Sequence, residues 1–136
     1  MAESRKMFRV QWGETDAAAI VFYPNYYRWF DAATHDLFRV LGYPVSRMLD
    51  DGVAVPLVEA QAQFRFPLRY DDEVTLLSRV VEARVRTFRV EHTILRGDQV
   101  CCEGYEERIW VRLLPGGEIE AQAIPDEVRA FIASEA

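Results

Sequence analysis

Apolar residues recur at spacings of three and four along one segment of the chain. This stripe consists of Tyr26, Phe30, Ala33, Leu37 and Leu41, with Phe38 beside it. Such spacing is typical of a helix that buries one face. Pro24 suits a first helical turn, while Gly42 suits a helix end and Pro44 discourages continuation. The pattern therefore predicts one long helix from near Asn25 to near Leu41.

After this helix the apolar residues recur at every second position, which is typical of strands. The predicted strands are Phe8–Trp12, Ala54–Phe66, Glu73–Ala83, Phe88–Ile94 and Val100–Leu113, with turns at Arg96–Asp98 and Pro115–Glu118 and a short helix over Pro125–Ile132. One long helix followed by several strands predicts an α+β fold, in which the helix lies against an antiparallel sheet. No repeat or linker divides the 136 residues, so we expect a single domain over residues 1–136.

The expected sheet has a second face and two edges. In the Ala54–Phe66 strand, Glu59, Gln61, Gln63 and Arg65 alternate with apolar residues. The second face is therefore expected to be partly solvated or to meet another chain. Because long strands with exposed edges favour pairing between subunits, we expect a homo-oligomer.

The overall charge narrows the classes of partner. The net charge is −6 and the isoelectric point is near 4.9, which argues against a general nucleic-acid binder. No stretch approaches the roughly 20 apolar residues that span a bilayer. Met1 to Arg9 is polar and charged and lacks the apolar stretch of a secretory signal. We therefore expect a cytoplasmic protein with neither a nucleic-acid nor a membrane partner.

The sequence contains few cysteine and histidine residues that could bind a metal. Cys101 and Cys102 are adjacent, so they form neither a CxxC redox pair nor a paired zinc-ligand set, and they are interpreted as buried free thiols. His92 lies on an apolar strand face and suits packing or an interface, whereas His35 falls off the helical stripe. We expect no metal and no cofactor.

Asp16 is the first candidate for chemistry, and two interpretations of it stay open. Loop aspartates most often make local turn bonds, which is the commoner structural outcome. Asp16 cannot cap the long helix, because Pro24 lies too far along the chain, and Ala19 stands where a capping box wants Glu or Gln. The alternative is a catalytic carboxylate. Glu14 is interpreted as a solvated loop residue.

The start of the long helix is the second candidate. Free backbone N–H groups around Tyr23 and the positive end of the helix dipole can hold a carbonyl oxygen as it gains charge. A carboxylate and such a helix end together are the smallest set of groups that acyl transfer needs. Every helix has such an end, however, so this feature is weak evidence by itself.

Two further groups have both a structural and a functional interpretation. Glu59 follows the apolar run VPLV in a strand expected to be largely buried, so it either faces a polar cavity or is paired. Arg84 and Arg86 share a face if the segment is extended, and Thr87 follows them. These arginines are either a solvated edge or a clamp for the phosphates of a nucleotide-bearing substrate.

Three segments carry a family resemblance. "WGETDAAAIVFYPNYYRWFDAA", "VPLVEAQAQFRFPLRYDDEV" and "RVRTF" resemble the hot-dog-fold acyl-CoA thioesterases of the 4-hydroxybenzoyl-CoA thioesterase type. The resemblance runs from about Phe8 into the last long strand. It implies a five-stranded antiparallel sheet wrapped around the helix, and dimers joined edge to edge and often paired into homotetramers. It also implies active sites at the subunit interface.

The resemblance also implies roles for individual residues. The catalytic aspartate falls on Asp16 and the oxyanion-binding amide on Tyr23, while the coenzyme A phosphate contacts fall near Arg86 and Thr87, with Arg84 beside them. Tyr26 and Trp29 supply aromatic surface for an acyl pocket, and Glu59 is a candidate for its lining. The expected reaction is hydrolysis of an acyl-CoA to a free acid and coenzyme A.

The sequence departs from the family at one position of the first motif. Ala19 stands where the family usually has glycine, which matters if that position needs a positive φ. Pro24 replaces the histidine of the short-chain relatives and so favours an aryl-acyl over a short-chain acyl substrate. A non-catalytic acyl-CoA or acyl-carrier binding module on the same fold is the alternative function. A dehydratase is less well supported, because neither histidine lies in the helix-entry motif.

Overall fold

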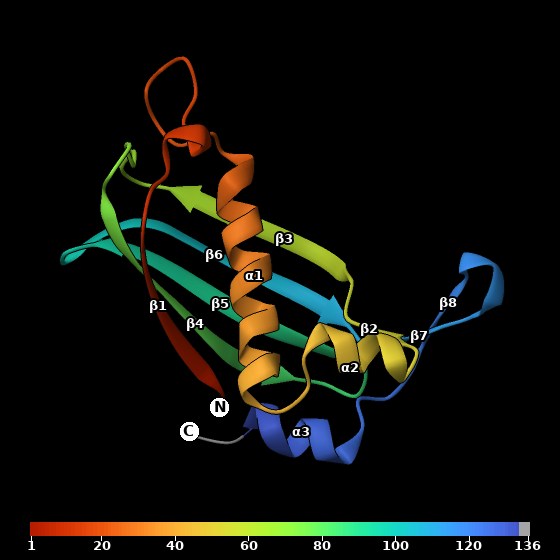
Figure 1. The fold of residues 1–136 in the computed structure, drawn as a ribbon. Coiled ribbons are helices and arrows are strands. Elements are labelled where there is room, and N and C mark those ends of the chain that lie inside the picture. The colour runs from red at the N-terminus through yellow and green to blue at the C-terminus, as the bar shows by residue number, and fades with distance from the viewer. Residues whose placement is uncertain (134–136) are drawn as a thin grey trace.

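A five-stranded antiparallel sheet wraps around one long helix (Figure 1). The computed structural model describes residues 1–133. The sheet has the order β1-β4-β5-β6-β3, made of β1 (Glu3–Arg9), β4 (Glu73–Ala83), β5 (Thr87–Arg96), β6 (Gln99–Ile109) and β3 (Leu57–Phe64). A smaller sheet joins β2 (Val53–Ala54), β7 (Val111–Leu113) and β8 (Ile119–Ala121). The helices are α1 (Pro24–Val40), α2 (Val45–Asp50) and α3 (Asp126–Ala133), with short 3₁₀ turns at Trp12–Glu14 and Pro115–Gly117. This confirms the expected α+β architecture.

Helix α1 packs on the sheet through the apolar stripe seen in the sequence. Tyr26, Phe30, Ala33 and Leu37 are all buried, while Leu41 is half-buried just beyond the helix. At the centre of this contact the helix comes very close to β6. A Cβ added to Gly104 would lie 2.8 Å from the Phe30 ring and 2.2 Å from the Gln61 carbonyl oxygen. Glycine at this position therefore allows the sheet to approach the helix.

Several predicted boundaries were wrong. The first strand is β1 rather than Phe8–Trp12, since β1 pairs with β4 from Glu3↔Arg79 to Arg9↔Glu73. The last long strand is interrupted at Trp110, whose amide donates to the Arg86 carbonyl. The chain then enters the smaller sheet. Helix α2 carried too short an apolar pattern to be recognised.

The strand that carries Glu59 is an edge strand, not a largely buried one. Within residues 1–133, β3 pairs on one side only, with β6. Leu57 and Val58 are 47% and 61% exposed. The apolar run VPLV therefore does not mark a buried strand. It presents apolar surface at the open edge of the sheet.

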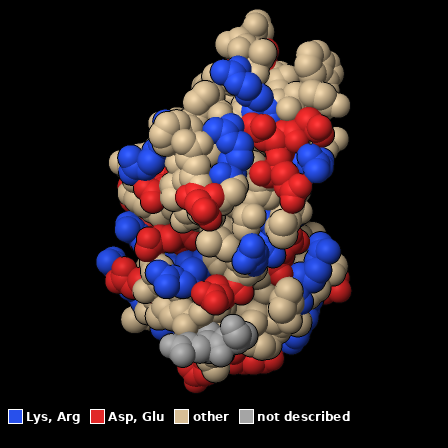
Figure 2. All heavy atoms as spheres, turned by 90° about the vertical axis from the view of Figure 1, so that its left-hand side faces the viewer, with Lys and Arg blue, Asp and Glu red and all other residues tan. Residues whose placement is uncertain are grey.

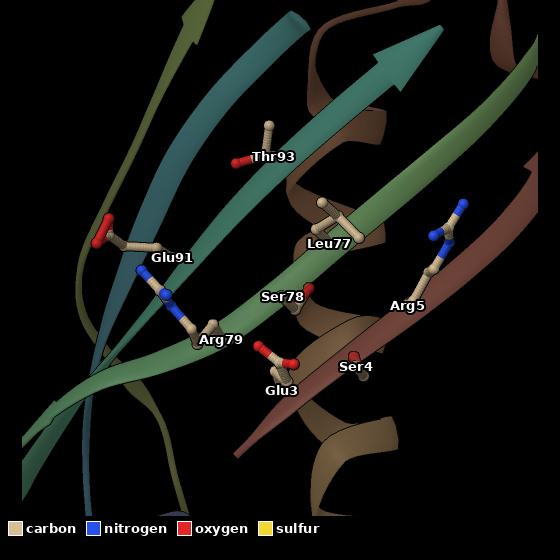
Figure 3. A pocket seen from close by; sticks show the side chains of 8 residues that line it. All are labelled: Glu3, Ser4, Arg5, Leu77, Ser78, Arg79, Glu91 and Thr93. Carbon is tan, nitrogen blue, oxygen red and sulfur yellow. The ribbon is translucent and has the colours of Figure 1, made fainter. Parts of the chain in front are cut away.

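The face of the sheet turned away from α1 is polar. A hollow of about 500 Å³ on this face is lined from β1, β4 and β5 by side chains that include Arg5, Arg79 and Glu91. Figure 3 shows how these side chains lie on the strands. These three make no ion pair within residues 1–133. On the side of the molecule seen in Figure 2, basic and acidic side chains are intermixed. No helix of the described chain is long and apolar enough to cross a membrane.

Candidate active site

Asp16 lies in a small hairpin that precedes α1. Thr15 and Val21 form an antiparallel bridge, and the Asp16 amide donates to the Ile20 carbonyl at 2.9 Å. The turn is possible because Ala19 has a φ of 62°. The position at which the family usually has glycine thus has the left-handed backbone that glycine favours, and here alanine adopts it.

The Asp16 side chain makes the local turn bond of the structural interpretation, and one of its two carboxylate oxygens stays without a hydrogen bond from the described residues. Its Oδ1 accepts the Ala18 amide at 2.8 Å, which is a local turn bond. No hydrogen bond to Oδ2 is found within residues 1–133, and the residue is exposed. Asp16 does not cap α1, as the sequence indicated, because α1 has no side-chain cap. One carboxylate oxygen therefore faces solvent in the hairpin that precedes the helix.

The start of α1 offers an unpaired amide. Tyr23 is the N-cap residue and Pro24 follows it. The Asn25 amide donates to the Phe22 carbonyl and the Tyr26 amide donates to the Tyr23 carbonyl. The Tyr23 amide donates to no acceptor in the described part of the chain. The positive end of the helix dipole lies at the same place. The arrangement is suited to stabilising negative charge on an oxygen atom.

An apolar hollow of about 330 Å³ opens beside this amide. It is lined by Ile20, Val21, Tyr23, Tyr26, Phe64, Arg65, Phe66 and Pro67. Tyr26 and Tyr23 line the same hollow, and the role of Tyr26 in an acyl pocket stays a prediction. Burial raises the pKa of Tyr26 to about 12, so its phenol stays neutral near pH 7. It can provide surface and a hydrogen bond but is not a base at that pH.

Trp29 does not share this hollow. It lines a separate one of about 250 Å³ on the β1 side of α1, together with Phe8 and Glu14. Its indole nitrogen donates to Glu14 Oε2 at 2.8 Å. Glu14 is consequently not the solvated residue expected from the sequence. Trp29 and Tyr26 line different hollows, although their rings pack edge-on with centroids 5.3 Å apart.

The basic segment Arg84–Thr87 lies at the opposite end of the sheet. β4 begins at Glu73, near the Asp16 hairpin, and ends at Ala83 (Figure 1). At roughly 3.3 Å per residue, these ends are about 33 Å apart. Arg84 pairs with Glu82 at 2.8 Å, whereas the Arg86 side chain has no ion-pair partner among the described residues. Within one chain, therefore, this segment and Asp16 do not form a single site.

Glu59 is paired, which was one of its two expected outcomes. Its Oε1 accepts a hydrogen bond from the Tyr105 hydroxyl at 2.5 Å, and Arg89 lies over the Tyr105 ring. Glu59 is exposed and lies away from the Tyr23 hollow. In the single chain it does not line that pocket.

A buried polar network between α1 and the sheet was missed by sequence reasoning. Ser78 Oγ lies 2.7 Å from His92 Nδ1, and His92 Nε2 lies 2.9 Å from Glu106 Oε1. This order resembles a serine–histidine–acid triad, but all three residues are 1% exposed and the His92 ring stacks on Phe30. A substrate cannot reach it. The signal was the polar alternation of Glu106 and Arg108 along β6.

Glu106 is charged within this network. Burial by itself raises the pKa of a carboxyl, but hydrogen bonds from His92 and Arg108 hold the pKa of Glu106 at about 2. Arg108 also donates to Asp31 of α1 at 2.6 Å. The network therefore joins the helix to β5 and β6 by charge-assisted bonds. His92 is a packed histidine, as expected.

The sheet wrapped around one long helix is the hot-dog fold of the thioesterases among the solved structures that resemble this chain. The thioesterase-like superfamily matches residues 10–132, and the chain belongs to this family.

Individual relatives support the same assignment. The chain is 32% identical over 126 residues to 4-hydroxybenzoyl-CoA thioesterase from Pseudomonas sp. (strain CBS-3), covering 90% of this chain and 78% of that protein. A gentisyl-coenzyme A thioesterase structure has a TM-score of 0.85 at 38% identity, covering 96% and 100% of the two chains. A mutant 4-hydroxybenzoyl-CoA thioesterase complexed with 4-hydroxybenzoyl-CoA has a TM-score of 0.88 at 26% identity, covering 98% and 100%. The expected fold and family are confirmed, and the protein is a thioester hydrolase.

Proposed function

We propose that the protein hydrolyses an aryl-acyl-CoA to the free acid and coenzyme A. The observation that carries this proposal is a pair of groups in one hairpin and the helix that follows it: an exposed Asp16 carboxylate whose Oδ2 accepts no hydrogen bond from residues 1–133, and a Tyr23 amide without an acceptor among them at the start of α1. The adjoining hollow, with Tyr26, Phe64 and Phe66, has the size and apolar lining that a ring needs. Two of its relatives are thioesterases for 4-hydroxybenzoyl-CoA and gentisyl-CoA.

The chemistry follows from these groups. The Tyr23 amide and the helix dipole polarise the thioester carbonyl and stabilise the oxyanion. Asp16 either attacks the carbonyl carbon, forming a mixed anhydride that water then cleaves, or removes a proton from an attacking water. In both routes the carbon–sulfur bond breaks, the thiolate of coenzyme A leaves and takes up a proton, and water supplies the oxygen of the acid. Both routes need the Asp16 carboxylate ionised.

Coenzyme A is proposed to bind across two subunits. Arg84, Arg86 and Thr87 are assigned to its phosphates, since guanidinium groups bind phosphate oxygens in forks. In one chain these residues lie about 33 Å from the Asp16 end. A pantetheine arm cannot bridge that distance within one subunit, so the phosphate-binding arginines belong to a neighbouring copy. Trp29 and Glu59 do not line the acyl hollow and are left out of this pocket.

The subunits are proposed to join through the open edge of β3. Among the strands of the described chain, none pairs with the outer side of β3, and β3 exposes Leu57, Val58 and Phe64. Pairing of two β3 edges across a two-fold axis gives the backbone groups of the strand hydrogen-bond partners and buries this apolar surface. A homodimer results, and the polar outer face of the sheet can join two dimers into a homotetramer. The free, buried Cys101 and Cys102 suit a reducing compartment, so the cytoplasm is the proposed location.

Replacing Asp16 tests the reaction. Asp16→Asn keeps the Oδ1 acceptor for the Ala18 amide but removes the charge. We expect kcat to fall by about 10³-fold or more on 4-hydroxybenzoyl-CoA or gentisyl-CoA, measured by release of free thiol. Asp36→Asn, which removes the charge of a half-buried α1 residue paired with Lys6, is the control and should keep full activity. Unchanged hydrolysis in Asp16→Asn would rule out the proposal. A wild type that binds acyl-CoA without turnover would instead favour a binding module.

A further inference from the structure

Glu14 collects an unusual number of hydrogen bonds for a loop residue. Its carboxylate accepts the Gln11 amide at 2.7 Å and the Trp29 indole N–H at 2.8 Å, and its carbonyl accepts the Phe22 amide at 2.8 Å and the Asn25 side-chain amide at 2.8 Å. Two of these four donors, Asn25 and Trp29, are side chains of α1 one turn apart. Because residues four apart share a helix face, both reach the same point.

We propose that Asn25 and Trp29 are positioning residues for hydrolysis, holding Asp16 in place by clamping Glu14 to the first turns of α1. Asp16 follows Glu14 by two residues, and Tyr23 is the N-cap of the same helix. The clamp thus ties the carboxylate and the oxyanion-binding amide to one rigid element. This inference rests on the proposed function and deepens it by assigning the residues that set the geometry of the site.

The hydrogen bonds within the hairpin cannot hold Asp16 in place relative to α1. The Ala18 amide donates to the Asp16 carboxylate and the Asp16 amide donates to the Ile20 carbonyl. These hydrogen bonds define the shape of the turn, but not where the turn lies relative to the helix. Contacts from outside the hairpin must place it. The Val21 amide donates to the Leu68 carbonyl at 2.8 Å, and Glu14 accepts hydrogen bonds from Gln11, Asn25 and Trp29. Asn25 is only 7% exposed, and its side-chain amide donates to the Glu14 carbonyl, so removing that donor leaves this carbonyl of the hairpin without the bond to α1.

The assignment of Trp29 differs from a substrate-binding role. Its ring packs edge-on against Phe8 and Tyr26, at 5.0 and 5.3 Å between centroids, and its polar atom is already engaged by Glu14. A residue of the acyl pocket would change KM when altered. A residue that only places Asp16 changes kcat with little effect on KM, because the ground-state contacts to substrate remain.

The test compares Asn25→Ala, Trp29→Phe and the double variant in the full-length protein. A misplacement of about 1 Å can cost about 10²-fold in rate, so we expect kcat to fall between about 10- and 100-fold in each single variant, with KM changed by less than about 3-fold. Because both residues act through Glu14, the double variant should lose less than the product of the two single losses. Ile132→Val, a core change at the far end of the molecule, controls for loss of stability and should keep kcat.

The outcomes separate this inference from the proposed function. If kcat is unchanged in Asn25→Ala, or if Trp29→Phe raises KM at constant kcat, the clamp is overturned, while an inactive Asp16→Asn still supports the reaction. Full activity in Asp16→Asn would overturn both. Trp29→Phe keeps an aromatic ring in the packing with Phe8 and Tyr26, so it provides the same test should Asn25→Ala not fold.

Discussion

At the scale of single residues, Ala19 is the most unusual position of the site. With a φ of 62° it occupies the left-handed region, where a Cβ costs about 1–2 kcal/mol. Glycine would remove this cost but adds about 0.5–1 kcal/mol of backbone entropy to be lost on folding. The first effect is the larger. The site hairpin therefore carries strain that its hydrogen bonds offset.

Replacing this residue should stabilise the protein. We expect Ala19→Gly to raise the free energy of unfolding by about 0.5–1 kcal/mol, measured by urea denaturation. Ala17, in the same hairpin, does not have a positive φ, so Ala17→Gly should lower stability by a similar amount. Equal effects of the two substitutions would show that the backbone of Ala19 is not strained.

At the scale of elements, the buried network decides how α1 is held against the sheet. Glu106 has a folded-state pKa of about 2 against an ordinary value of 4.5. Because its pKa is lowered by folding, the stabilisation is fully present above about pH 4.5 and is lost as the pH falls towards 2. A difference of this size corresponds to about 3 kcal/mol. Helix docking is therefore acid-sensitive.

Stability measured against pH tests this contribution. Wild-type protein should lose about 3 kcal/mol of unfolding free energy through this group between about pH 4.5 and 2. Glu106→Gln should be less stable at pH 7 by about 3 kcal/mol, since it leaves Arg108 poorly compensated, and should show a flatter profile in that range. Glu107→Gln, which alters the neighbouring pair with Arg89, should keep the wild-type slope. A steep acid transition in Glu106→Gln would contradict the assignment.

At the scale of the whole molecule, the single chain leaves the proposed site incomplete. The Asp16 hairpin and the Arg84–Thr87 segment lie at opposite ends of the sheet (Figure 1). The β3 edge, with Val58 61% exposed, offers the surface that would bring the two ends of different copies together. Assembly and catalysis are thus expected to be coupled.

Disrupting the edge should dissociate the protein and reduce activity together. A charge at Val58 would be buried unpaired in the interface, so Val58→Asp should yield monomers at micromolar concentration in sedimentation or light-scattering experiments. Its kcat/KM should fall at least about 10-fold, because coenzyme A would lose the phosphate contacts of the second subunit. Val40→Asp, at an 82% exposed position at the end of α1, should change neither property. An assembled Val58→Asp variant would place the interface elsewhere.

The elements that could be predicted were those whose own pattern is strong. The stripe from Tyr26 to Leu37 and the alternation in Glu73–Ala83 each specify which face is buried, because periodicity and burial are linked locally. β3 was misjudged as largely buried, since an apolar run in the sequence looks the same whether the strand lies in the core or at an exposed edge of the sheet. Helix α2 and the break at Trp110 depend on contacts with distant residues.

For the site, the sequence by itself determined the helix, its start at Pro24 and the presence of Asp16 just before it. The family resemblance then assigned the chemistry. Only the tertiary structure decided that Glu14 is clamped by Asn25 and Trp29, that Trp29 and Tyr26 lie in different hollows, and that His92, Ser78 and Glu106 meet in the core. The reason is physical: periodicity reports which way a side chain faces, whereas a hydrogen bond needs a partner whose position is set by the packing of remote segments.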